Sequence, residues 1–454
     1  MRLIFLLAAI ISACSTTFAD DRHVVLITLD GFPAYLLGDP RAPIPTLRKL
    51  AAEGVWAEGM RVSNPSITWP NHTTLVTGVT PAKHSVLFNG VLVRDRDGTR
   101  VTIDPARDQS ELVAVPTILD IAHQAGLTTA AINWPCTRNS ASIDDNFPDV
   151  PGQIDFMTPR LKDELRADGI LPVGTQQEWA KLSSPQWEGI WTEAACYVIR
   201  HRKPNLLLLH IGPDAVHHYY GPQTMAGYTA CALADREVRD VLAALDDAGI
   251  RGQTAVIVTA DHGFAADKKL VEPNVLLRKQ GLLNAAPSGI VAGQVQVVSE
   301  GGTAFVYFSD PQTAAQLRDK VVKLFQGQEG IAEVITPDRY PGLGLPTPDK
   351  NPHIGDLLLA AQDGYAFAGI ATGEDAVRPA LIGVSMVGNH GYLSSNPKMN
   401  AVFIAAGRGI PKQKPIGVID NTAVAPTAAA LLGLQIPNAE GTPLSDVLTK
   451  DVTR

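Results

Sequence analysis

The sequence predicts a three-layer α/β sandwich in which a mostly parallel central sheet lies between two layers of helices and carries an inserted smaller α+β subdomain. Two observations lead to this fold class. Short, continuous apolar runs recur along the 454-residue chain, and segments with helical patterning lie between them. Apolar runs that do not alternate with polar residues are typical of strands buried on both faces, and strands that alternate with helices are typical of parallel sheets.

Five apolar runs are the candidate strands of this sheet. They span residues 23–29, 127–133, 205–211, 255–260 and 401–406, of which 127–133 is the weakest. The other four each end at a segment that contains glycine, which is a common signal for the end of a strand.

Three segments carry a helical pattern. Between residues 233 and 245 apolar side chains recur at helical spacing with charges between them, and Gly249 follows as a stop signal. Residues 115–125 and 46–52 have a similar pattern. These helices alternate with the apolar runs, as the sandwich requires.

The stretch 265–373 breaks this rhythm. It contains short strand-like pieces, one helical pattern and a region of Pro- and Gly-rich turns, at 303–308, 356–361, 311–324 and 340–352. Because the fourth strong apolar run comes after it, we expect an inserted subdomain at 265–373. The main, catalytic α/β domain is then formed by 20–264 and 374–454.

Composition and charge exclude several classes of protein. With 45% hydrophobic and 19% charged residues, the chain is neither disordered nor collagen-like nor a coiled coil. Its formal net charge of -8 argues against binding to a nucleic-acid duplex, which requires clustered Lys and Arg. The net charge does not exclude a small anionic substrate, because only a local site has to attract it.

The first 19 residues have the order of a secretory signal peptide. Arg2 is followed by an apolar run and then by small residues up to Ala19. The run is too short for a transmembrane helix, which needs about 20 residues. Cleavage after Ala19 and a lipobox that ends at Cys14 are both open. We expect an exported protein, periplasmic or secreted, with a lipoprotein anchored through Cys14 as the alternative.

The other cysteines do not form a recognisable metal site. Cys136, Cys196 and Cys231 are three in number, so they allow at most one disulfide, whose pairing the sequence does not give. No Cys-x-x-Cys pair is present, which argues against a thiolate zinc site. We interpret all three as small buried residues.

Acidic side chains follow three of the predicted strands. Asp30 and Asp261 come directly after their runs, and Asp214 comes within three residues of its run. The carboxyl ends of parallel strands form the ligand crevice of such sheets, and three carboxylates gathered there need a cation. His218 and His262 lie close to these acids in sequence. Imidazole together with carboxylate favours zinc or a similar transition metal.

A hydroxyl residue stands at the start of another predicted helix. Thr68 precedes Pro70, and proline is tolerated in the first turn of a helix. Free backbone N–H groups at this end suit either an alkoxide nucleophile or a phosphoryl oxygen. A helix cap is the structural alternative, and the spacing alone leaves both open.

Together these segments resemble the alkaline phosphatase superfamily and, within it, the nucleotide pyrophosphatase/phosphodiesterase branch, as a bacterial exported member. The segments that carry the resemblance stand in the family's order along nearly all of the mature chain. They are 29–32, 68–72, 75–78, 213–222, 259–263 and 389–392.

The resemblance implies two zinc ions per chain and assigns their ligands. One ion is held by Asp214, His218 and His390, and the other by Asp30, Asp261, His262 and Thr68. His390 is assigned chiefly by resemblance. Asn89 matches an asparagine that donates to a phosphoryl oxygen, and we expect the backbone N–H after Thr68 to assist it.

The implied activity is hydrolysis of small phosphodiesters or nucleotide pyrophosphates through a phosphothreonyl intermediate on Thr68. A phosphomonoesterase or phosphonate hydrolase of the same superfamily is the alternative, and a non-catalytic exported binding protein is the alternative from another class. A sulfatase is disfavoured, because its precursor residue is Cys or Ser where Thr68 stands. Physiological substrate and oligomeric state remain open.

Several neighbouring residues are candidates for secondary roles. Phe32, Tyr219 and Tyr220 flank predicted ligands and are either substrate contacts or ordinary wall residues. Arg138 either contacts a second phosphoryl oxygen or is a solvated loop charge. His217 is a rival to His218 as a ligand, and His72 and His84 are interpreted as supporting or structural residues.

Overall fold

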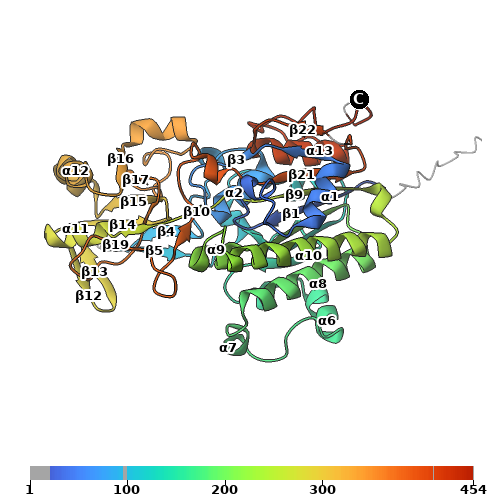
Figure 1. Ribbon diagram of the computed structural model, residues 1–454, viewed down its shortest axis with the longest axis horizontal. Coiled ribbons are helices and arrows are strands. Elements are labelled where there is room, and N and C mark those ends of the chain that lie inside the picture. The colour runs from blue at the N-terminus through green and yellow to red at the C-terminus, as the bar shows by residue number, and fades with distance from the viewer. Residues whose placement is uncertain (1–20, 96–99, 413, 453–454) are drawn as a thin grey trace, which may run out of the picture.

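The computed structural model of the chain describes residues 21–95, 100–412 and 414–452. An eight-stranded sheet runs through the larger part of the molecule in the order β22-β2-β21-β9-β1-β8-β6-β7 (Figure 1). Its strands are β1 (His23–Leu29), β2 (Val55–Ala57), β6 (Thr129–Pro135), β7 (Asp145–Asp149), β8 (Leu206–Ile211), β9 (Thr254–Thr259), β21 (Phe403–Gly407) and β22 (Lys414–Ile416). The predicted fold class is confirmed.

The middle of the sheet is parallel and wholly buried. β1 pairs in parallel with both β8 and β9, so Leu26 lies beside Leu208 on one side and Ile257 on the other. Every residue of these three strands is buried. The absence of alternation in the apolar runs therefore reflects helices on both faces.

The last predicted strand, β21, is antiparallel to both of its neighbours, β9 and β2. The chain before it lies at the carboxyl edge of the sheet, where the N–H groups of Gly263 and Phe264 donate to the carbonyls of Met399 and Lys398. A strand that starts at this edge has to run back across the sheet. The apolar pattern predicted a strand here, but it carries no information on direction.

Helices cover both faces of the sheet (Figure 1). One face is covered by α1 (Pro45–Glu53), α8 (Ser184–Arg202) and α10 (Met225–Asp247), and the other by α2 (Thr68–Thr77), α5 (Ile118–Gln124) and α13 (Val424–Leu432). The helix predicted at 233–245 is longer than expected because Thr224 caps its first turn, with Oγ1 3.1 Å from the N–H of Gly227. α8 and the short edge strands were not predicted.

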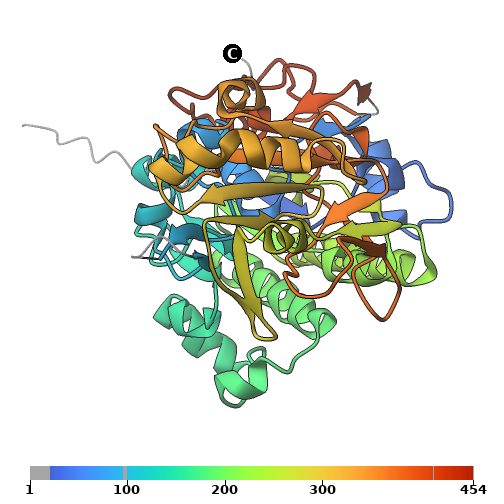
Figure 2. The same cartoon turned by 90° about the vertical axis from the view of Figure 1, so that its left-hand side faces the viewer.

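A second body of structure lies at one end of the sheet (Figures 1 and 2). Four antiparallel strands pair in the order β14-β15-β17-β16, formed by β14 (Val295–Ser299), β15 (Thr303–Phe308), β16 (Ile331–Ile335) and β17 (Leu357–Ala361). Helix α12 (Pro311–Phe325) packs against this sheet, and the unit has its own buried cluster around Val306, Val321 and Leu359.

Strand pairing in this second body continues beyond residue 373. β19 (Val377–Pro379) pairs with β11 (Lys269–Val271), which also pairs with β18 (Tyr365–Phe367). β10 (Ala265–Ala266) pairs with β20 (Gly388–Asn389), so the chain leaves the main sheet and returns to it side by side. The domain boundaries at 265 and 373 stay a prediction.

Three further expectations concern the compartment. The predicted leader 1–19, including Cys14, lies outside the described residues. Cys136, Cys196 and Cys231 are buried free thiols. Over the ranges that the structure describes, no helix combines the length and the apolar character needed to cross a membrane.

One buried carboxylate joins two helices of the same face. Asp235 of α10 is 3% exposed and accepts hydrogen bonds from the N–H groups of Leu47, at 2.8 Å, and Thr46, at 3.1 Å. These donors belong to the first turn of α1, which has no side-chain cap of its own. Asp235 therefore satisfies N–H groups that would otherwise be buried without a partner.

We predict that Asp235→Ala lowers the free energy of unfolding by about 1–3 kcal/mol, because it leaves these donors unpaired. Chemical denaturation followed by circular dichroism measures the effect. Asp240→Ala on the same helix is the matched control, because Asp240 makes only surface ion pairs with Arg236 and Arg239 and is expected to contribute less than about 1 kcal/mol. Equal effects of the two substitutions would contradict the capping role.

Candidate functional site

The three predicted acids meet at the carboxyl edge of the sheet. Asp30 follows β1, Asp261 follows β9, and Asp214 is the first residue of α9 (Asp214–Tyr220), which begins three residues after β8. Because β1 lies between β8 and β9, the three turns are neighbours. Backbone contacts tie them together: the N–H of Asp30 donates to the carbonyl of Ile211, and the N–H of Gly31 donates to Asp261.

His262 and His390 complete two groups of possible metal ligands, and a third group is formed by His72, His210 and Asp261. In one group, the ligand atoms of Asp30, Asp261 and His262 all lie within 4.8 Å of one another, and in the other those of Asp214, His262 and His390 do so. His262 Nε2 is 3.2 Å from Asp261 Oδ2, and His218 Nε2 is 3.5 Å from Asp214 Oδ2. The structure thus brings together all six acids and histidines predicted as ligands, and His262 borders both groups.

Backbone carbonyls fix the orientation of the three imidazole rings. Nδ1 of His218 lies 2.9 Å from the carbonyl oxygen of Gly388, that of His262 3.1 Å from Gly263, and that of His390 3.2 Å from Ser66. Since a carbonyl oxygen can only accept, Nδ1 donates in each ring and Nε2 keeps its lone pair. Metal-binding histidines are oriented in the same way.

Unpaired buried atoms at the centre of this cluster fit a cation. Oδ1 of Asp30, Oδ1 of Asp214, Oδ2 of Asp261 and Nε2 of His262 are buried and have no hydrogen-bond partner among the described residues. All are acceptors, so they repel one another and cannot satisfy one another. A donor set of carboxylate oxygen and imidazole nitrogen suits zinc.

The pKa values of these groups reflect the same lack of positive charge. Burial, with the charge of Asp261 second, raises the pKa of Asp30, and burial raises that of Asp261 to about 7. Burial and the neighbouring histidines lower the pKa of His390 well below its ordinary value. Burial also lowers the pKa of His262. A bound cation would offset the cost of ionising the buried carboxylates, and it requires neutral histidines, which the lowered pKa values of His262 and His390 favour.

Thr68 is the first residue of α2 and is 8% exposed. The N-cap position belongs to Ile67, so Thr68 does not occupy the capping position that was its structural alternative. Asn71 holds the turn before the helix, because its side chain accepts from the N–H of Ser63 and donates to the carbonyls of Pro65 and Ile67. The start of the helix, and with it Thr68, is therefore rigidly placed.

Asn89 approaches the same turn from another loop. Its Oδ1 accepts a hydrogen bond from the N–H of Trp69 at 2.9 Å. This contact fixes the orientation of the amide, since only the oxygen can accept, and leaves the NH₂ group as the free donor. The N–H after Thr68, which we expected to face a phosphoryl oxygen, is here engaged by Asn89.

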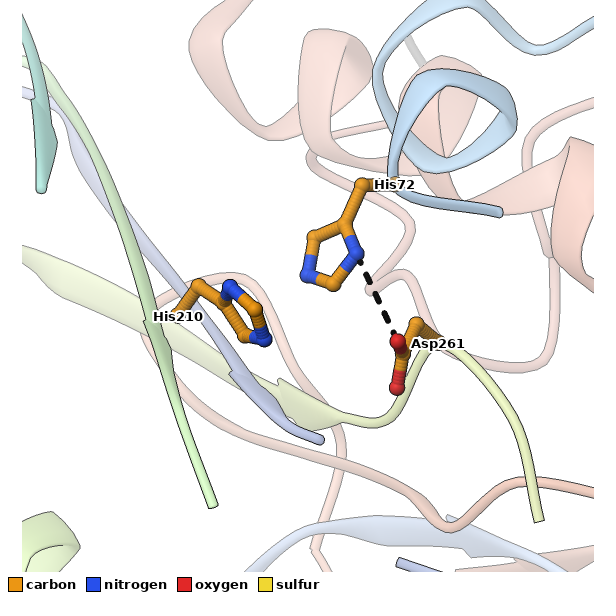
Figure 3. A group of neighbouring side chains, drawn as sticks. All are labelled: His72, His210 and Asp261. Atoms are coloured by element: carbon orange, nitrogen blue, oxygen red, sulfur yellow. Dashed lines mark ion pairs between the residues drawn. The ribbon is translucent and has the colours of Figure 1, made fainter. Parts of the chain in front are cut away.

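Two further histidines, His72 and His210, lie close to Asp261 (Figure 3). His72 of α2 and His210 of β8 flank Asp261, with His72 Nδ1 3.6 Å from Asp261 Oδ2 and His210 Nε2 3.0 Å from Asp30 Oδ2. A role for His210 was not predicted, because this residue lies inside the apolar run 205–211. The signal was available: a histidine inside a buried strand, one residue from its carboxyl end, needs a polar partner.

His210 adds positive charge to the cluster. Burial opposes its protonation, but the hydrogen bond to Asp30 and the charges of Asp30 and Asp261 raise its pKa to about 10. Its Nδ1 lies 3.0 Å from the carbonyl oxygen of Asn133, so both ring nitrogens have acceptors. His72 differs, because burial lowers its pKa well below the ordinary value. His210 therefore offsets part of the negative charge, and His72 supports the cluster as a neutral residue.

The remaining candidates are sorted by their contacts. Phe32 is 0% exposed and packs in the main core, and its contact with substrate stays a prediction. Arg138 pairs with Asp108 at 2.8 Å and stacks on Phe156, away from the ligand groups. Tyr219 is 52% exposed on α9. Tyr220, beside it, is also exposed.

Contacts also show the roles of His217, the rival of His218 as a ligand, and of His84, which was interpreted as a supporting or structural residue. His217 is buried, with Nδ1 3.1 Å from the carbonyl oxygen of Gly31 and Nε2 3.6 Å from Cys231 Sγ, so it faces away from the groups that His218 joins. His84 is buried, with Nε2 3.1 Å from Thr74 Oγ1. It supports the packing of α2.

A pocket of about 460 Å³ adjoins the ligand cluster. His218, His390 and Asn89 line one side of it. The other side comes from the second body of structure and includes Leu270, Glu300, Phe367, Arg378, Val384 and Met386. A molecule bound at the cluster therefore has room to extend between the two parts of the fold.

Comparisons with known proteins agree with this arrangement. Venom phosphodiesterase CdcPDE of Crotalus durissus collilineatus is 23% identical over 438 residues, which are 93% of this chain and 46% of the relative. Bis(5'-adenosyl)-triphosphatase enpp4 of Xenopus laevis is 23% identical over 427 residues, 92% of this chain and 79% of the relative. The chain thus spans about half the length of the venom enzyme, and ectonucleotide pyrophosphatase/phosphodiesterase family member 3 of Rattus norvegicus is covered over only 25% of its length.

Solved structures share the fold. Human ectonucleotide pyrophosphatase/phosphodiesterase 5 superposes with a TM-score of 0.71 at 18% identity, over 94% of this chain and 100% of the other. The murine protein of the same name superposes equally well as an inactive threonine-to-alanine variant in complex with AMP. Most of the chain, residues 24–393, matches the type I phosphodiesterase / nucleotide pyrophosphatase family, and the protein is therefore a member of that family.

Proposed function

We propose that the protein hydrolyses small phosphodiesters or nucleotide pyrophosphates through a phosphothreonyl intermediate, at a centre that holds two zinc ions. The observation that carries this proposal is the set of buried acceptor atoms of Asp30, Asp214 and Asp261 that have no hydrogen-bond partner among the described residues. They lie at the edge of the sheet where such folds bind ligands. Paired cations in such a position are a common device of phosphoryl transfer.

The division of the proposed ligands between the two ions follows the family resemblance. In the structure His262 belongs to the group of Asp30 and Asp261 as well as to that of Asp214 and His390, and His218 lies beside Asp214. Asp214, His218 and His390 would hold one ion, and Asp30, Asp261, His262 and Thr68 the other. When bound, the ions would lower the pKa of the Thr68 hydroxyl and neutralise charge on the phosphoryl oxygens.

The chain's own residues would carry out the displacement in two steps. Oγ1 of Thr68, having lost its proton, attacks phosphorus; the Thr68–phosphorus bond forms and the bond to the first leaving oxygen breaks. Water then adds to phosphorus and the threonine oxygen leaves and regains a proton. The free NH₂ group of Asn89 donates to a phosphoryl oxygen, while its Oδ1 stays bound to the N–H of Trp69.

The relatives support a nucleotide as one kind of substrate. The venom enzyme is named a phosphodiesterase, the Xenopus relative is named for bis(5'-adenosyl) triphosphate, and the murine structure contains AMP. The threonine-to-alanine change that marks the murine protein as inactive also supports a nucleophilic threonine.

The charges of the pocket favour a diester over a monoester. A monoester dianion calls for additional cationic side chains, and Arg378 is the one Lys or Arg among the residues that line the described pocket. Its Nε already donates to Glu272 at 2.9 Å. Arg138, the cation considered for this role, is paired with Asp108.

We also propose that the protein works outside the cytoplasm, in the periplasm or as a secreted enzyme. The support is the pattern of the first 19 residues, with Arg2 before an apolar run and small residues at its end. Lipidation of Cys14 is the alternative route of retention after export.

We predict that Thr68→Ala lowers kcat for bis-p-nitrophenyl phosphate by at least about 10³-fold, because it removes the nucleophile. Zinc content, measured by atomic emission, should stay within error of the wild type. Thr77→Ala is the matched control, since its hydroxyl donates only to the carbonyl of Thr73 within the same helix. Full activity of the Thr68 variant would remove this residue from the role of nucleophile.

We predict about two zinc ions per chain, since the six acids and histidines divide into two sets of three. Chelation should abolish activity and lower the thermal midpoint, because a bound ion stabilises only the folded chain. Asp261→Asn should lose bound metal, whereas Asp363→Asn, on the surface beside Lys398, should not. A chain that binds no metal and is indifferent to chelation would favour a non-catalytic binding protein.

We predict that kcat/KM for bis-p-nitrophenyl phosphate exceeds that for p-nitrophenyl phosphate by at least about tenfold, because the pocket lacks an unpaired cation for the second negative charge. Both rates are measured on the zinc-loaded protein by release of p-nitrophenolate. A clear preference for the monoester would replace the diesterase with the phosphomonoesterase.

A further inference from the structure

The buried side chain of Glu300 has no role in the chemistry proposed above. It lies between β14 and β15, is 6% exposed, and borders the pocket that also contains His218, His390 and Asn89. Its Oε2 lies 2.9 Å from Thr303 Oγ1, whose one hydroxyl proton is shared with the carbonyl oxygen of Gly391 at 2.7 Å. Its Oε1 is buried and has no hydrogen-bond partner among the described residues.

The backbone holds Glu300 in a fixed position beside the ligand cluster. Its N–H donates to the carbonyl of Thr303, and two residues further on the N–H of Gly302 donates to the carbonyl of His390. Gly391 approaches so closely that a Cβ there would lie 1.8 Å from the carbonyl oxygen of Glu300. These backbone contacts therefore hold Glu300 in a fixed position next to His390, one of the predicted metal ligands.

The charge of Glu300 is not balanced within the pocket. Arg378 is the one Lys or Arg of the described lining, and it is engaged by the buried carboxylate of Glu272. Leu270, Phe367 and Val384 make much of the wall apolar. A positive group on a ligand would pair with this carboxylate, whereas a purely apolar group would leave it unsatisfied.

We propose that Glu300 is a specificity-determining residue that binds a protonated primary amine on one ester substituent of the substrate. The preferred substrates are then zwitterionic aminoalkyl phosphodiesters, with the phosphoryl group at the ligand cluster and the ammonium group at Oε1 of Glu300. This inference rests on the proposed function for its reaction, and on the pocket itself for its binding site.

The test compares two p-nitrophenyl phosphodiesters whose second ester group is either 2-aminoethyl or propyl. The wild type should favour the aminoethyl ester in kcat/KM by at least about tenfold, the usual value of a charged hydrogen bond. Glu300→Gln keeps the shape and an acceptor oxygen but removes the charge, and should abolish most of this preference while the propyl ester is cleaved at a rate within about threefold of the wild type.

Two further variants make the comparison specific. Glu300→Asp keeps the charge and should retain part of the preference. Glu329→Gln removes an acid from the surface of the same body, where it pairs with Lys269, and should leave the preference unchanged. An equal preference for the amine in the wild type and in Glu300→Gln would overturn the inference, as would the absence of any preference in the wild type.

A binding measurement separates this inference from the proposed reaction. If the wild type hydrolyses neither ester, the proposed function has failed, and titration calorimetry with 2-aminoethyl propyl phosphate and dipropyl phosphate then tests the site directly. Tighter binding of the amine by about tenfold, lost in Glu300→Gln, supports the amine site without the reaction. Equal affinity for the two probes overturns it. The thermal midpoint of each variant shows that it is folded.

Discussion

Mutual repulsion among three neighbouring carboxylates, each with a buried and unpartnered oxygen, is the constraint on which the rest of this structure depends. Asp30, Asp214 and Asp261 come from neighbouring turns of one parallel sheet and leave acceptor atoms without hydrogen-bond partners among the described residues. Such an arrangement costs free energy unless positive charge is present. The fold tolerates it because the surrounding core is large and because His210 supplies part of the positive charge. Burial opposes the protonation of His210, but its hydrogen bond to Asp30 and the neighbouring acidic charges raise its pKa to about 10.

The imidazole rings depend on parts of the chain that lie far apart in sequence. His218 is oriented by the carbonyl of Gly388, and His390 by that of Ser66, which precedes the helix of Thr68. Asp267 accepts from both Asn389 and Tyr392, so the segment with His390 is fixed from both sides. The return of the chain from the second body is therefore a structural condition for the centre, as well as a connection between two parts.

The sequence predicted the features that follow from local pattern and strand order. Asp30 and Asp261 could be placed because an apolar run ends just before each of them, and parallel strands end at one edge. His390 has no such signal, since only the two-residue strand β20 precedes it, and its assignment needed the family resemblance. His210 was missed inside its strand. Phe32 packs in the main core, and its closeness to Asp30 in sequence carried no information on which side of the turn its side chain lies.

The predicted metal centre and the pocket wall come from different parts of the fold. This explains why local sequence pattern predicted the centre but not the pocket. The acids and Thr68 belong to the main sheet and its first helices, whereas Glu300, Phe367 and Val384 belong to the second body and line a pocket that it shares with His218 and His390. No periodicity relates these later residues to the sheet, because strand pairing in a separate body sets their positions. Changes in that wall alter what fits beside the centre without disturbing the carboxylates, so we expect selectivity within this fold to vary through the second body while the centre is kept.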